Sequence, residues 1–158
     1  EARVADLVND KLASIGEKIG ISKFERIDAP YVASYIHGAN RIGVLVGLSE
    51  ASAEAGKDLA MQIAAMNPIA VDADAVPPAA IERERAVITE QIRNDPKMAG
   101  KPDEMINKIA GGKLNAFFKE NTLIGQAYVK DNARTVGAFL KTLNPNLKVT
   151  GFKRVQLG

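Results

Sequence analysis

The sequence predicts an α+β fold: a small antiparallel sheet with flanking helices and an inserted antiparallel helical (coiled-coil) hairpin. The segment Ser34–Leu48 joins two apolar, β-rich runs through a short polar connection that contains glycine and the only histidine. Other segments repeat apolar residues at helical spacing. From Pro77 to Lys119 the β-rich runs stop and charged residues become denser. This shift in composition indicates a separate, helical element.

The N-terminal region is expected to form a helix over residues 2–19, because its apolar residues recur every three or four positions on one face. Gly20 suits the left-handed conformation that ends many helices. Residues 21–27 alternate in polarity, which favours a strand. A turn follows at Asp28–Pro30, since proline presets φ.

A hairpin and a helix are expected next. Tyr31–His37 and Arg41–Leu48 are predicted to pair as neighbouring strands. The second run is nearly all apolar, so we expect both of its faces to be covered, and its glycines indicate close approach by another element. Ser52 is expected to cap a helix that ends at Met66.

The charged middle of the chain predicts two helices. After a short edge strand at Ile69–Val71, Pro77-Pro78 favours the start of a helix over 79–93. A turn rich in proline and glycine separates it from a second helix over 103–119. Two helices of similar length around one turn predict an antiparallel hairpin, inserted at residues 77–120. Its narrow apolar stripe indicates a projecting, mostly solvated element.

The C-terminal part returns to mixed patterns. Leu123–Val129 favours a strand, Thr135–Leu143 a short helix, and Leu147–Leu157 the closing strand. Alternation places Tyr128 and Val129 in the core, unless that strand lies at an edge.

Composition limits the class of protein. The 158 residues suffice for one domain, with or without an appendage, and no cysteine is present. The net charge of +2 comes from basic residues scattered among acids, without tryptophan, so direct binding of nucleic acid is not expected. No apolar run approaches the ~20 residues of a membrane-spanning helix. The N-terminus does not resemble a secretory signal, so a cytoplasmic location is expected.

Catalytic and cofactor motifs are not found. Gly38 and Gly43 are spaced like a phosphate loop, but Val44-Leu45 stands where Lys-Ser/Thr is needed. With one histidine and no cysteine, neither a histidine-based metal site nor a triad can be assembled. We therefore expect no cofactor, and an enzyme is the weakest alternative.

Two features leave alternatives open. His37 is either a turn-adjacent histidine that hydrogen-bonds locally or a recognition residue held at the end of a hairpin. Ile15-Gly16 is either an ordinary helix end or a surface that a partner's backbone approaches closely.

Short motifs in collinear order cover nearly the whole chain, and together they resemble bacterial translation elongation factor Ts. The residues that carry the resemblance are Ile15-Gly16-Glu17, Ser34–Ala39, Arg41–Val46, Ile63–Ala65, Pro68, Gly125-Gln126, Thr135–Gly137 and Val149–Arg154.

The resemblance implies a guanine-nucleotide exchange factor that binds elongation factor Tu (EF-Tu) and has no catalytic residues of its own. It implies that residues 1–27 end a first core subdomain and that residues 28–158 form the second, which carries the hairpin. The positions that match family contacts with EF-Tu are Ile15, Gly16, His37, Lys57 and Val129. Two departures are Asp58, where some members carry a basic residue, and Asn40, which resembles a one-residue insertion.

Another departure concerns the trigger of exchange. Family members carry an N-terminal ubiquitin-associated-like domain and a Thr-Asp-Phe motif that disturbs the nucleotide site of EF-Tu, and neither occurs in these residues. A fragment that binds EF-Tu with little exchange activity is therefore expected. The alternative is a structural or dimerisation module that self-associates, forming a homodimer through exposed sheet edges.

Overall fold

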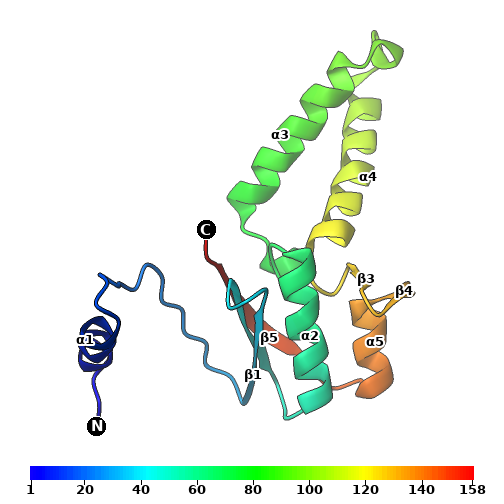
Figure 1. Ribbon diagram of the computed structural model, residues 1–158. Coiled ribbons are helices and arrows are strands. Elements are labelled where there is room, and N and C mark those ends of the chain that lie inside the picture. The colour runs from blue at the N-terminus through cyan, green and yellow to red at the C-terminus, as the bar shows by residue number, and fades with distance from the viewer.

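The computed structural model describes all residues from 1 to 158 and confirms the predicted α+β class (Figure 1). Two short 3-10 helices lie at Ala73–Ala75 and Pro96–Met98. The helices are α1 (Val4–Ile15), α2 (Ala53–Met66), α3 (Pro78–Asn94), α4 (Asp103–Asn121) and α5 (Val136–Leu143). The strands are β1 (Tyr31–His37), β2 (Ile42–Leu48), β3 (Ala127–Tyr128), β4 (Asp131–Thr135) and β5 (Val149–Gln156).

An antiparallel sheet of order β1-β2-β5 forms the centre of the fold. The apolar strand β2 lies in the middle, and its side chains at Val44, Val46 and Leu48 are buried. Helix α2 packs against β1 and β2, and the side chain of Ser52 caps it by accepting a hydrogen bond from Ala55 N, as predicted. These elements and α5 enclose the main hydrophobic core.

Gly47 on β2 confirms that a glycine of this strand permits close approach. A Cβ built there would lie 2.6 Å from Thr150 Oγ1, 2.9 Å from Ala29 Cβ and 3.2 Å from Ile27 Cδ1. Thr150 belongs to the neighbouring strand β5, while Ala29 and Ile27 come from the segment before β1. This segment therefore covers the second face of the sheet at Gly47.

Helices α3 and α4 form the predicted antiparallel hairpin, which projects away from the sheet (Figure 1). Its own small core lies at the interface of the two helices and is separate from the main core. The buried members of this hairpin core are Ile88, Ile92, Ile106, Ala110 and Leu114.

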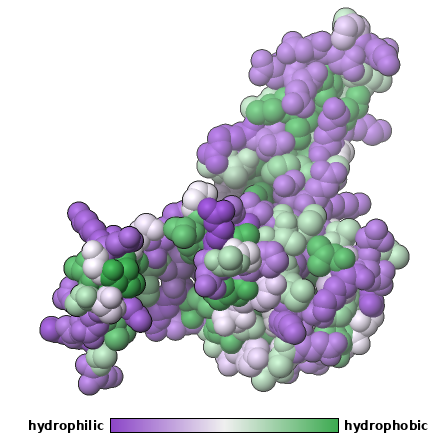
Figure 2. All heavy atoms as spheres, viewed as in Figure 1, coloured by the Kyte–Doolittle hydropathy of each residue, from purple (hydrophilic) through white to green (hydrophobic).

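Helix α1 buries no residue. Figure 2 shows apolar side chains on its outer surface, and Val4, Leu7 and Ile15 are each more than half exposed. Ile15 is its last residue, so the predicted helical end at Ile19 is wrong. The chain enters the left-handed conformation at Gly16 instead of Gly20, and this ends the helix four residues early.

Three predicted strands differ from the structure. Residues 21–27 are not a strand: their backbone pairs with neither sheet. Within Ile69–Val71 only one parallel bridge forms, between Ala70 and Thr122. The strand predicted over Leu123–Val129 shrinks to Ala127–Tyr128, since turns occupy most of that region.

Candidate protein-interaction surface

The end of α1 carries two of the predicted contact residues. Ile15 is 57% exposed. Gly16 has a φ of 77° and donates its N–H to Leu12 O at 2.9 Å. Apart from its two chain neighbours, no residue has an atom within 4 Å of the position that a Cβ would take at Gly16. The backbone conformation at the helix end therefore explains this glycine, and the space beside it is open.

His37 lies at the closed end of the β1–β2 hairpin, opposite Ile42. Its Nδ1 is 2.9 Å from Tyr35 Oη, a contact that alternation permits because both residues face the same side of the strand. The turn that follows has a positive φ at Gly38, Ala39 and Asn40. The local hydrogen bond expected for His37 is thus present, and the residue stays exposed.

Lys57 and Asp58 are neighbours on α2 that face different surroundings. Lys57 is exposed, whereas Asp58 is only 6% exposed. The Asp58 carboxylate accepts a hydrogen bond from Tyr128 Oη at 2.9 Å and forms an ion pair with Lys130 Nζ. A carboxylate removed from water needs such partners. Asp58 therefore makes an internal contact with the β3–β4 hairpin, and Lys57 is the member of the pair that faces solvent.

Val129 lies at the turn between β3 and β4. Tyr128 before it is buried, as predicted, but Val129 is 44% exposed and lies outside the core. This is the exception expected for an edge strand, because β3 pairs only with β4. Its backbone N–H donates to Gln62 Oε1 at 2.9 Å, and Gln62 Nε2 donates to Ala127 O at 3.0 Å. The turn is therefore bonded to α2 through its backbone, while the valine side chain points to the surface.

Tyr128 anchors this turn from the inside. Its ring stacks on Phe139 with centroids 4.2 Å apart and planes 12° from parallel. Burial raises the pKa of Tyr128 to about 12, and the hydrogen bond to Asp58 acts in the same direction. The phenol therefore remains protonated at neutral pH and can donate to the carboxylate.

The internal polar cluster on α2 was not predicted from the sequence. Asp58 and Gln62 are four residues apart, which places them on one helix face beside the core residues Leu59 and Ile63. Gln126, also buried, receives a hydrogen bond from Gln62 at 3.3 Å. Two polar residues spaced by four on a face that is otherwise apolar are the signal that could have revealed this cluster.

The structure brings together only some of the predicted contact residues. Lys57 and Val129 lie in one region, because their neighbours Asp58 and Lys130 form an ion pair. Ile15 and Gly16 lie at the C-terminal end of α1, and Figure 1 places α1 and the β3–β4 hairpin at opposite sides of the molecule. The candidate contacts therefore form separate patches and no single pocket.

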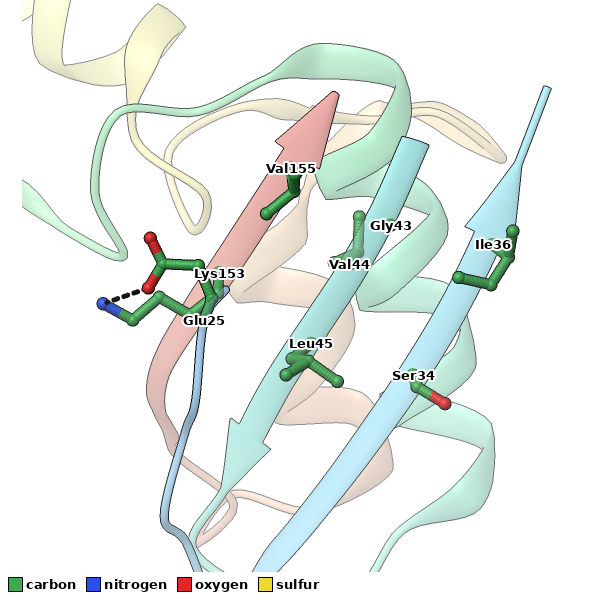
Figure 3. Close-up of a pocket in the computed structure, with 8 residues that line it drawn as sticks. All are labelled: Glu25, Ser34, Ile36, Gly43, Val44, Leu45, Lys153 and Val155. Carbon is green, nitrogen blue, oxygen red and sulfur yellow. Dashed lines mark ion pairs between the residues drawn. The ribbon is translucent and has the colours of Figure 1, made fainter. Parts of the chain in front are cut away.

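A shallow apolar groove lies on the face of the sheet opposite α2 (Figure 3). Ile36, Leu45 and Val155 line it from the three strands, and an ion pair of 3.6 Å between Glu25 and Lys153 borders it. Such a surface can receive apolar side chains of a partner, and Ser34 adds a hydroxyl to its lining. No three His, Asp or Glu residues cluster closely enough to hold a metal ion.

None of the helices combines the length and the apolar character needed to cross a bilayer.

Comparison with known proteins gives one consistent result. The family model described as Elongation factor TS matches residues 1–158. The elongation factor Ts of Christiangramia forsetii is 44% identical over 158 residues, which cover 98% of this chain and 56% of that protein.

Two further relatives agree. The elongation factor Ts of Amoebophilus asiaticus is 45% identical, with coverage of 98% of this chain and 56% of that protein. That of Aromatoleum aromaticum is 47% identical over 137 residues, with coverage of 86% and 45%. The chain thus spans only a little more than half the length of the curated relatives it matches most fully.

Proposed function

This chain belongs to the elongation factor Ts family, and from that membership we propose that it acts in translation as part of a guanine-nucleotide exchange factor for EF-Tu. The observation that carries the proposal is the match of one family model to the whole chain. Its place of action would be the cytoplasm, where protein synthesis occurs.

The proposed activity is binding and not chemistry. A protein that binds nucleotide-free EF-Tu more tightly than the GDP form must weaken GDP binding by the same factor, because coupling between two ligands is reciprocal. GTP then fills the empty site when it is more abundant. This mechanism needs no catalytic residue and no cofactor, only an exposed surface that recognises the partner.

We propose that Ile15, Gly16, His37, Lys57 and Val129 contact EF-Tu. All five are exposed, which a contact residue requires. Gly16 leaves open space for a partner's backbone, and His37 and Val129 lie at the ends of two hairpins.

We also propose that residues 1–27 belong to a first core subdomain and residues 28–158 to a second, with the insertion at 77–120. This division is supported by burial: α1 buries no residue, whereas the strands and helices from Tyr31 onward share one core apart from the hairpin.

Release of a fluorescent GDP analogue from EF-Tu tests the function. Increasing amounts of the 158-residue chain are added, with a full-length family member as the control. Because these residues contain no Thr-Asp-Phe sequence, we expect binding to EF-Tu with little acceleration of release. Release as fast as with the full-length factor would contradict the expected dependence on that motif. Absence of any binding would contradict the proposed function.

A second candidate function is self-association. The apolar groove of Figure 3, with Ile36 exposed in its lining, favours a module that pairs with another copy. Sedimentation over a range of concentrations, without EF-Tu, separates the two candidates. A dimer that does not bind EF-Tu would support the structural module, and a monomer that binds EF-Tu would exclude it.

A further inference from the structure

We propose that Gln62 and Asp58 are positioning residues, which fix residues 127–130 (the 127–130 loop) so that Val129 is presented outward in one conformation. The inference rests on the proposed function, because Val129 is there a contact with EF-Tu. It adds two residues of α2 that cannot touch a partner themselves, since Gln62 is fully buried and Asp58 is 6% exposed.

The loop is held at four consecutive residues. Gln62 Oε1 accepts a hydrogen bond from the N–H of Val129 at 2.9 Å, and Gln62 Nε2 donates one to Ala127 O at 3.0 Å. The Asp58 carboxylate accepts a hydrogen bond from Tyr128 Oη at 2.9 Å and forms an ion pair with Lys130. Two side chains one helical turn apart therefore bond every residue of the loop, through backbone groups at alternate positions and side chains at the others.

The support behind Gln62 is also bonded. Gln62 Nε2 donates a hydrogen bond to Gln126 Oε1 at 3.3 Å, and Gln126 Nε2 donates one to Glu120 O at 3.1 Å. The cluster thus extends from α2 to the end of α4. Buried polar groups with satisfied bonds specify one arrangement, because breaking any of them leaves an unpaired group away from water.

The exposure of Val129 indicates that this cluster has a role in binding. Tyr128 is 4% exposed and Val129 is 44% exposed, so the cluster holds the loop with Tyr128 buried and Val129 on the surface. An apolar side chain on a loop that is already ordered binds with a smaller entropic cost than one on a mobile loop. Preorganisation of Val129 should therefore show in affinity as well as in stability.

The main test uses Gln62→Met, which keeps the length of the side chain and removes its hydrogen bonds. Three quantities are measured: hydrogen exchange of the Val129 amide, the melting temperature, and the affinity for EF-Tu freed of nucleotide. The control is Ile63→Val, which removes one methyl group from the main core on the same helix and leaves every hydrogen bond and ion pair to the loop in place.

Gln62→Met is expected to speed exchange at Val129 and to weaken binding by about two- to tenfold, the range that corresponds to one net hydrogen bond. Ile63→Val is expected to lower the melting temperature without changing either of the other two quantities. Asp58→Asn gives a second test that keeps an acceptor for Tyr128, and it should act in the same direction as Gln62→Met.

Two results would overturn the proposal. Unchanged exchange at Val129 in both Gln62→Met and Asp58→Asn would show that the cluster does not hold the loop. Faster exchange with wild-type affinity would reduce the cluster to a role in stability. If the wild-type chain does not bind EF-Tu, the proposed function fails, and hydrogen exchange alone then decides whether the loop is held.

Discussion

Replacement of Tyr128 by phenylalanine is the sharpest probe of the buried cluster. The stacking on Phe139 at 4.2 Å is preserved, and only the hydrogen bond of 2.9 Å to Asp58 is removed. Hydrogen bonds to charged groups contribute about 1.5–3 kcal/mol to stability. Because Lys130 still pairs with the carboxylate, we expect the free energy of unfolding to decrease by an amount near the lower end of that range.

Alkaline pH tests the burial of the Tyr128 phenol separately, because burial is the main cause of its raised pKa. The pKa of Tyr128 rises from 10.0 to about 12 on folding, so the unfolded chain loses this proton first. The associated stability is fully present below pH 10 and is lost as pH rises through about 12. The difference of two units corresponds to about 3 kcal/mol at 1.36 kcal/mol per unit. Tyr128→Phe should lack this loss.

The assay is urea denaturation followed by circular dichroism, at neutral pH and at several values above pH 10. Tyr35→Phe is the matched control, because it removes a phenol that bonds to the exposed His37. The Tyr35 ring is half-buried, but the hydrogen bond that its hydroxyl makes is exposed, and the loss of a surface contact changes stability by about 0.5 kcal/mol or less. Equal losses of stability in the two variants, or parallel alkaline profiles for wild type and Tyr128→Phe, would refute the reasoning.

Three further predictions concern separate parts of the molecule. Gly47→Ala should lower the free energy of unfolding, measured by urea denaturation, by about 1–3 kcal/mol, because the new Cβ would lie 2.6 Å from Thr150 Oγ1. Gly112→Ala is the control and should cause no such loss, because the space beside Gly112 is open. Ile88→Ala should speed hydrogen exchange in α3 and α4 but not in α2, since the hairpin core is separate; uniform acceleration would contradict this. His37→Ala should weaken binding to EF-Tu with a change in stability of about 0.5 kcal/mol or less, and wild-type affinity would remove His37 from the contacts.

The elements that the sequence predicted well are those with a strong local pattern. The β1–β2 hairpin, α2 with its cap at Ser52, and the α3–α4 hairpin all follow from periodicity and from turn or cap residues. Their side chains face one core each, so local pattern and tertiary burial agree.

The errors in the strands and in the polar cluster have a different cause, because these features depend on partners distant in the sequence. Residues 21–27 alternate like a strand, yet no strand pairs with them, and they contact β5 through side chains, as in the ion pair between Glu25 and Lys153. Strand β4 was missed because Asp131–Thr135 is polar, and its pairing with β3 depends on a turn that α2 supports. The buried role of Asp58 likewise appears only when Lys130, far along the chain, is placed beside it.

The candidate contacts differ in how firmly the fold holds them, and this affects what each can contribute to binding. Helix α1 has 12 residues and buries none, and isolated helices of that length are marginal in water. Contact through Ile15 and Gly16 would therefore carry the cost of ordering α1. Val129 belongs to a loop bonded at every residue, so its contact carries little such cost. Equal contact areas at the two places should thus contribute unequally to affinity, with the larger share from the 127–130 loop.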